Sequence, residues 1–282
     1  MNTSKIRIIT YGIALGSLAF VGFERGYLSK TIAASTEQGS LTLVANGEDF
    51  VRQGFTSKDG WKISFDHLYV NLGEAIAYST DSTFEPQKND TKESIEYEGK
   101  IEFLNAAKTA DLAAGSADAE PITVAEANVP SGFYNALAWE TTPGKSDSPI
   151  PNKTMALIGS ATKDGRTVSF DLGLNQPTEY LCGEYVGDMR QGIVAADTSG
   201  KVEMTFHFDH LFGDANTAPD DALNQDALGF QPLANLASNG SIKLDGDDLA
   251  TQLSPEENRL LTEAIAGLGH VGEGHCVVTN SQ

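Results

Sequence analysis

The sequence is poor in basic residues, in cysteine and in long hydrophobic runs, and each shortage excludes a class of protein. It has 19 lysines and arginines against 39 aspartates and glutamates in 282 residues, a formal net charge of −20 at pH 7. Such a chain repels nucleic acids and anionic membrane surfaces, which are bound through clusters of Lys and Arg. Nucleic-acid binding is therefore excluded. The acidity serves either solubility in a salty or external medium or the capture of cations.

Only one long apolar run is present, from Ile8 to Phe23 near the N-terminus. Basic residues precede this run and small residues around Ala33 follow it, which is the three-part form of a secretory signal peptide. We therefore expect residues 1–33 to direct export, and residues 34–282 to form one domain in the periplasm or outside the cell. The alternative is an uncleaved N-terminal membrane anchor, because two basic residues separate the run from the cleavage region. Sixteen residues are, however, short for a spanning helix.

The sequence contains two cysteines, Cys182 and Cys276. In an oxidising compartment a lone pair of cysteines is most simply a disulfide, and we expect one here. Closing a loop of roughly 100 residues removes about 4–5 kcal/mol of unfolded-chain entropy. The alternative is metal ligation by thiolate, since Cys276 directly follows His275.

From residue 40 onward the hydrophobic pattern repeats every two residues and is rich in β-branched and aromatic side chains, as in half-buried strands. The segment 61–72 places Trp61, His67 and Tyr69 on one face, and turn signals such as Lys163-Asp164-Gly165 separate the segments. Many short strands without alternating helices predict a mainly β fold, an antiparallel β-sandwich. The other predicted strands are Ile95–Leu104, Gly132–Glu140, Met155–Thr162, Thr167–Leu172 and Lys201–Asp209.

One helix is predicted, over residues 254–268 at the C-terminal end. Ser254 and Glu257 form a capping box around Pro255, and an apolar stripe follows. Gly267 is expected to end the helix. The tail that follows would then be held beside Cys182 by the disulfide.

All five histidines fall in three short segments: FDH with His67, FHFDHLFGD with His207 and His210, and GHVGEGHC with His270 and His275. On an extended strand His207 and Asp209 share a face, while the two flanking phenylalanines face the core. His210 points away unless the strand ends there. Neutral imidazole with carboxylate suits zinc, copper, nickel or iron rather than calcium or magnesium. We therefore predict a transition-metal site, whose candidate ligands are His207, His210, His270, His275, His67 and Asp209.

Two of these features have simpler interpretations. A histidine on an aromatic face, as His67 is here, is more often a hydrogen-bonded core residue than a ligand. The acidic segment from Asp214 to Asp221 could hold calcium, but its spacing does not match an EF-hand, so solvated loop acids are the better interpretation.

The segments FTSKDGWKISFDHLYV, TFHFDHLFGD and LGHVGEGHC resemble those of a family of bacterial secreted or envelope proteins. More distantly, their layout is similar to periplasmic metal-binding β-sandwich proteins, such as the copper-binding partners of di-haem enzymes. This resemblance implies metal binding, and it implies His207 and His210 as ligands.

The sequence therefore predicts an extracytoplasmic protein that binds zinc or copper in metal acquisition or homeostasis, with an envelope transporter or a redox protein as candidate partner. One alternative is a structural or adhesive envelope domain without metal. A second is a metal-dependent hydrolase, because residues 207–210 read H-x-D-H, half of a metallo-β-lactamase motif. That motif fails at Thr205, where a histidine is required, and we expect a binding protein rather than an enzyme.

Overall fold

The structure is a computed structural model that describes residues 37–89 and 91–279. The predicted signal peptide, residues 1–33, lies outside the described residues, and the fold described below is that of the compact unit within residues 35–282.

A five-stranded sheet forms one layer of a sandwich, in the order β16-β15-β13-β1-β6. Alternate side chains of its strand β1, including Leu41 and Leu43, are fully buried, as expected for a strand with one face on the core. β1 pairs in parallel with β13, and the remaining pairs of this sheet are antiparallel. The strands are β1 (Gln38–Asn46), β6 (Ile122–Pro130), β13 (Ser199–Phe206), β15 (Gly269–Val271) and β16 (Gly274–His275).

A ten-stranded sheet forms the second layer and extends beyond the first. Its main path runs β14-β10-β9-β3-β8-β11-β17, and β2, β4 and β5 also pair with β3. These strands are β2 (Phe55–Thr56), β3 (Lys62–Ser79), β4 (Gly99–Leu104), β5 (Lys108–Asp111), β8 (Ala136–Thr141), β9 (Met155–Lys163), β10 (Arg166–Leu174), β11 (Thr178–Cys182), β14 (Ser241–Asp245) and β17 (Val277–Thr279). The short strands β7 (Gly132–Phe133) and β12 (Ile193–Val194) form a separate pair.

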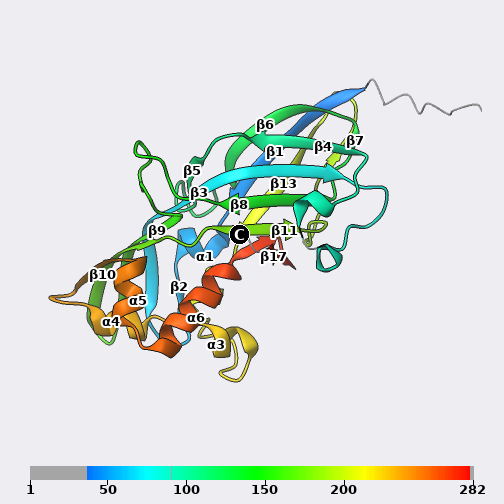
Figure 1. Ribbon diagram of the computed structural model, residues 1–282. Helices are drawn as coiled ribbons and strands as arrows, with labels where there is room; N and C mark the ends of the chain where they lie inside the picture. Colours follow the sequence, from blue (N-terminus) through cyan, green and yellow to red (C-terminus); the bar gives the residue numbers. More distant parts are fainter. Residues whose placement is uncertain (1–36, 90, 280–282) are drawn as a thin grey trace, which may run out of the picture. The chain divides into compact units, whose positions relative to one another are not determined.

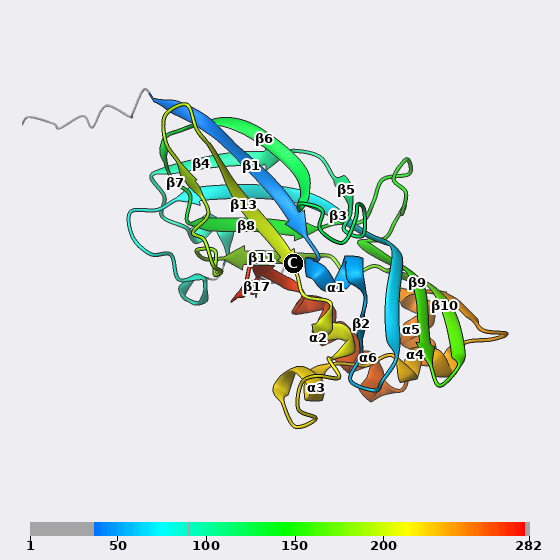
Figure 2. The ribbon, with the colours of Figure 1, turned by 180° about the vertical axis from the view of Figure 1, so that it is seen from behind.

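The two layers are seen from opposite sides in Figures 1 and 2, with β3 and β8 in front in the first view and β1 and β13 in front in the second. Between them lies the main core, where the ring of Trp139 on β8 contacts those of Tyr180 on β11 and Phe206 on β13. The centroid of the Trp139 ring is 4.2 Å from that of Tyr180 and 5.0 Å from that of Phe206. These aromatic contacts join the end of β13 to the strand that carries Cys182.

Helices gather around the part of the large sheet formed by β9 and β10, where α4 and α5 lie against one face (Figures 1 and 2). The longest helix, α6, begins with the predicted capping box: Ser254 accepts the Glu257 N–H, and the Glu257 carboxylate accepts the Ser254 N–H. The helices are α1 (Glu48–Gln53), α2 (Asp209–Phe212), α3 (Ala222–Asp226), α4 (Gln231–Leu236), α5 (Gly246–Gln252) and α6 (Pro255–Ala266), with 3₁₀ turns η1 (Pro86–Lys88) and η2 (Lys92–Ser94).

The prediction of a mainly β, sandwich-like fold with a C-terminal helix is confirmed. The structure differs from it in detail, because β1 with β13 and β10 with β14 are parallel pairs, and five shorter helices accompany α6 in the described residues. Both parallel pairs join strands far apart in sequence, which a local pattern does not reveal.

A β-bulge in β3 corrects the predicted position of His67. The pairing with β9 shifts between Phe65 and His67, so Asp66 is an extra residue and the alternation of side chains is displaced by one. Leu68 and Val70 consequently take the buried face, and His67 is exposed.

The predicted disulfide is present: Cys182 on β11 is bonded to Cys276, which precedes β17. A disulfide is compatible with an oxidising compartment. Since both cysteines are bonded, the alternative of thiolate metal ligation is wrong.

Among the described residues, no helix combines the length and the hydrophobicity needed to cross a membrane.

Candidate metal centre

Two segments of chain meet at the end of β13. That strand ends at Phe206, three residues earlier than predicted, and α2 begins at Asp209. Phe206 and Phe208 are fully buried, as predicted. Because the strand ends before His207, the alternation of side chains between its two faces does not extend to His207 and Asp209. The expectation that these two residues share a strand face therefore does not apply. The chain turns there instead and brings the His210 ring toward the His207 ring.

The second segment is the tail after α6. Gly267 ends the helix, and β15 then pairs with β13 in a register that sets His270 opposite Thr205. β16 folds back on β15 and sets His275 opposite His270. The Thr205 hydroxyl accepts the Gly272 N–H at 2.8 Å and holds the turn between these two strands. The end of β13 and the tail therefore lie together, as a site that includes His207 and His270 requires.

The rings of four histidines form a continuous cluster. The His207 ring stacks on the His270 ring with 4.0 Å between centroids, and His210 stands edge-on to His270 at 5.0 Å. One ring nitrogen from each of His207, His210 and His270 lies within 4.8 Å of the others, close enough for one metal ion. His207 and His270 are buried and His210 is half-buried, so these side chains are held in place by packing.

Backbone carbonyls orient these rings. His207 Nε2 lies 3.1 Å from the Gly272 oxygen, and His270 Nδ1 lies 3.3 Å from the Leu268 oxygen. Because a carbonyl only accepts, the facing nitrogen carries the hydrogen, which leaves Nδ1 of His207 and Nε2 of His270 as lone-pair donors. His210 likewise hydrogen-bonds the backbone of Gly267. Metal-binding histidines in proteins are held in this manner by a partner on the second nitrogen.

The fourth histidine, His275, contacts the donor nitrogen of His270. Its Nδ1 lies 2.8 Å from His270 Nε2, and since that nitrogen is a lone-pair donor, His275 donates the hydrogen. The His275 side chain is exposed, and its ring lies 4.4 Å from that of His270. A metal ion on His270 would replace this hydrogen bond and release the His275 imidazole beside the ion.

Burial favours the neutral form of His270 and of His210. It lowers the pKa of His270 to about 3, and the neighbouring His207, His210 and His275 lower it further by charge repulsion, whereas the hydrogen bond that His270 donates to the Leu268 carbonyl raises it. Burial also lowers the pKa of His210 below its usual value, although nearby Asp209 raises it. Neutral imidazole is the form that binds metal, so His270 is ready to bind at any pH near neutrality.

Carboxylates surround the cluster, and the sequence pattern did not identify the nearest of them. Glu48, at the start of α1, has its Oε1 3.5 Å from His207 Nε2. Burial raises the pKa of Glu48 to about 7, and the charges of Glu273, Asp209 and Glu203 raise it further. The one local signal is the Asn-Gly turn that precedes Glu48, where the Asn46 side chain accepts the Glu48 N–H.

Besides His275, two other predicted ligands are outside the group of three. Asp209 accepts the backbone N–H of His210 at 3.0 Å, which fixes the first turn of α2. His67 pairs with Asp111 at 2.7 Å and stacks on Tyr69, with no ring contact to the other histidines. His67 therefore lies outside the candidate site. The bulge at Asp66 displaces the alternation of side chains along β3 and leaves His67 exposed.

In the acidic segment from Asp214 to Asp221, two aspartates accept hydrogen bonds from nearby backbone N–H groups. Asp214 accepts the N–H of Asn216, and Asp221 caps α3 by accepting the N–H of Leu223. Among the described residues no carboxylate cluster comparable to the histidine group is found there.

A cavity of about 520 Å³ lies beside the cluster. His210 and His275 line it, together with Asp226 and Glu263 and the apolar side chain of Leu223. The histidines are thus approached from solvent through an opening that carries two carboxylates.

No protein-family model, no curated protein and no solved structure matches this chain.

Proposed function

We propose that this protein binds a transition-metal ion, zinc or copper, outside the cytoplasm, in metal acquisition or homeostasis. The observation that carries the proposal is the convergence of His207, His210 and His270 to within 4.8 Å, with each ring hydrogen-bonded to the backbone. A set of imidazoles that is buried on one side and opens to a cavity on the other suits a borderline or soft ion.

The residues present fit such an ion. Three imidazole nitrogens supply three positions of a tetrahedral shell, and His275 is placed to supply the fourth. The surrounding carboxylates favour a cation, and the net charge of −20 concentrates cations around the whole protein. Calcium and magnesium are disfavoured, because they require oxygen ligands.

The proposed location depends on the predicted leader and on the disulfide, which persists in oxidising compartments. Cell fractionation tests it: the protein should be recovered outside the cytoplasm. Recovery from the cytosol with residues 1–33 intact would contradict this part of the proposal.

Calorimetric titration of tag-free, chelator-treated protein with zinc and with copper tests the site. We expect one of these ions to bind more tightly than about 10 μM, roughly 7 kcal/mol. His207→Ala and His270→Ala should each weaken binding at least a hundredfold, because each removes a buried ligand. His275→Ala should weaken it less, since this side chain is exposed and reaches the ion only after leaving His270.

His67→Ala is the matched control, because it removes a histidine that is paired with Asp111 away from the cluster. It should bind as the wild type does. If the wild type binds neither ion at 10 μM, or if the cluster variants bind as His67→Ala does, the histidines are structural and a metal-free envelope domain is the better interpretation.

A further inference from the structure

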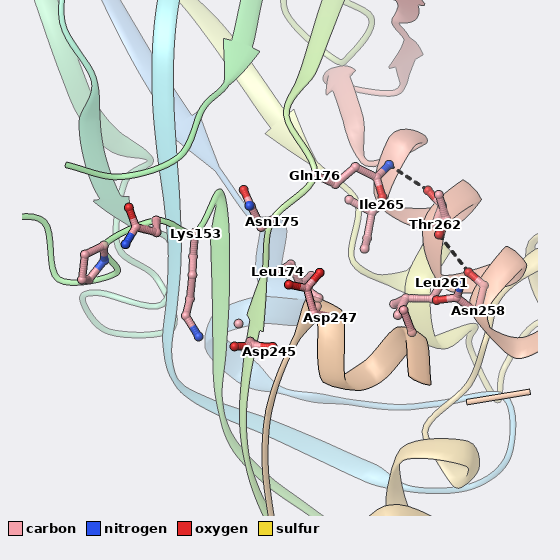
Figure 3. A pocket seen from close by; sticks show the side chains of 15 residues that line it. Lys153, Leu174, Asn175, Gln176, Asp245, Asp247, Asn258, Leu261, Thr262 and Ile265 are labelled. Atoms are coloured by element: carbon pink, nitrogen blue, oxygen red, sulfur yellow. Dashed lines mark hydrogen bonds between the residues drawn. The ribbon is translucent and has the colours of Figure 1, made fainter. Parts of the chain in front are cut away.

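A second cavity, of about 580 Å³, lies between the end of β10, the start of α5 and one face of α6 (Figure 3). Leu261, Thr262 and Ile265 of α6 line it, whereas Glu263, Ala264 and Gly267 line the cavity beside the histidines. The two cavities therefore lie on different faces of the same helix. The volume of this second cavity is within the range of small-molecule sites.

A lysine without a partner lines one side of this cavity. Lys153 lies across Gly173, where a Cβ atom would overlap its ammonium group, so the glycine makes room for the lysine. In the described part of the chain the Lys153 ammonium forms no ion pair or hydrogen bond. Lys62 and Lys145 also lack a partner among the described residues, but both are exposed, whereas Lys153 is half-buried and lines the cavity.

Two carboxylates line the same cavity. The parallel pairing of β14 with β10 sets Asp245 opposite Gly173, next to the strand position that Lys153 crosses. Asp245 accepts the Asp248 N–H as the cap of α5 through Oδ1. Asp247, in the first turn of α5, has no partner among the described residues. In Figure 3 Lys153 lies on one side, α6 lies on the other, and the two aspartates lie between them.

The rest of the lining combines apolar and amide groups. Leu174, Leu261 and Ile265 supply an apolar surface, and Gln176 is fixed by donating from Nε2 to the Thr262 carbonyl at 3.0 Å. None of the described aromatic side chains lines the cavity, so these residues offer no flat surface on which a sugar ring or a nucleobase would stack.

We propose that this cavity binds a small zwitterion of net positive charge, such as a basic amino acid. The Lys153 ammonium matches a carboxylate, and Asp245 with Asp247 match two cationic groups, which together is the charge pattern of lysine or arginine. The apolar surface matches the methylene chain between those groups. This site is separate from the proposed metal centre and does not depend on it.

Titration calorimetry of the full mature protein with L-lysine and L-arginine tests the proposal. We expect binding with a dissociation constant below about 1 mM, a free energy near 4 kcal/mol. Cadaverine lacks the carboxylate that Lys153 would bind, and L-norleucine lacks the side-chain ammonium, so each should bind at least tenfold more weakly than L-lysine. L-Glutamate should not bind.

Variants identify the cavity as the place of binding. Lys153→Met and Asp247→Asn should each weaken L-lysine binding at least tenfold, and Gly173→Ala should do so by displacing the lysine side chain. Lys145→Met and Asp220→Asn change the same residue types outside this cavity and should have no effect. His270→Ala should also bind L-lysine normally, which separates this result from any failure of the metal proposal.

Two outcomes would overturn the proposal. One is the absence of L-lysine and L-arginine binding at 10 mM. The other is equal binding of cadaverine, or binding that Lys153→Met leaves unchanged, since either would mean that the aspartates attract any cation without a built site.

Discussion

Among single residues, His270 has the largest consequence for acid stability. Its pKa in the folded protein is about 3, below the 6.5 of an exposed histidine, so the unfolded chain binds its proton first as pH falls. The stability that depends on neutral His270 is complete above pH 6.5 and is lost as pH decreases from 6.5 toward 3. We predict that the melting temperature of the metal-free protein falls steeply over this range.

The variant His270→Gln should flatten that dependence, because glutamine does not titrate. Thermal melts at half-unit steps from pH 7.5 to 4 make the comparison. Identical slopes for His270→Gln and the wild type would show that the histidine cluster does not cause the acid transition.

For Glu48 we predict the opposite dependence of stability on pH. Its pKa is raised to about 7, above the 4.5 of an exposed glutamate, so the folded protein favours the protonated form. Its contribution to stability is complete below pH 4.5 and is lost as pH rises through 7. In the absence of metal, Glu48→Gln should therefore stabilise the protein at pH 8 by roughly 1–3 kcal/mol and change little at pH 4.5. Urea unfolding at both pH values measures this, with exposed Glu126→Gln as control, and a destabilised variant at pH 8 would refute it.

Part of the site could be predicted residue by residue. The clustering of four histidines could be predicted from the sequence, because they lie at the end of a strand and in a disulfide-linked tail. These are His207, His210, His270 and His275. His67 was misplaced, since one extra residue at a bulge reverses the faces of a strand. Glu48 was missed because its approach to His207 depends on the parallel pairing of β1 with β13, which joins segments more than 150 residues apart.

At the scale of elements, the turn between β15 and β16 positions two of the histidines. Gly272 in this turn has φ +59°, and a Cβ there would overlap the Val186 carbonyl. We predict that Gly272→Ala destabilises the protein by about 1–3 kcal/mol and weakens zinc or copper binding at least tenfold, because the turn must shift. Urea unfolding and metal titration measure the two effects.

Gly165→Ala is the matched control for this turn. Gly165 also has positive φ, +78°, but nothing lies within 4 Å of the added Cβ, so this variant carries the backbone strain without the overlap. Unchanged metal binding in Gly165→Ala and weakened binding in Gly272→Ala would assign the effect to the turn. Normal binding in both would mean that the tail histidines do not hold the ion.

Elements differed in how far the sequence predicted them. Helix α6 was predicted because the Ser254–Glu257 capping box and the apolar stripe are local signals. Met155–Lys163 and Arg166–Leu174 were predicted nearly to their ends, since a turn joins them into a hairpin. The two-residue strands β2, β7, β12 and β16 are too short to show any periodicity, and they exist only through their partners.

At the scale of the whole described unit, the disulfide links the large sheet to the tail that carries the histidines. Cys182 lies on β11, whose Tyr180 packs on Trp139 and donates from its hydroxyl to the Ile265 carbonyl near the end of α6. Cys276 directly follows His275, so the same bond fixes both the end of the large sheet and one side of the cluster.

The double variant Cys182→Ser with Cys276→Ser tests this connection without leaving a free thiol. The two cysteines are 94 residues apart, so removing the bond should cost about 4–5 kcal/mol in urea unfolding by the loop-entropy relation. Metal affinity should fall by a smaller factor than in His270→Ala, because pairing with β13 still holds His270 while His275 gains freedom. If the folded double variant binds zinc or copper as tightly as the wild type, then β15 and the Thr205–Gly272 hydrogen bond alone position the tail, and the disulfide serves stability only.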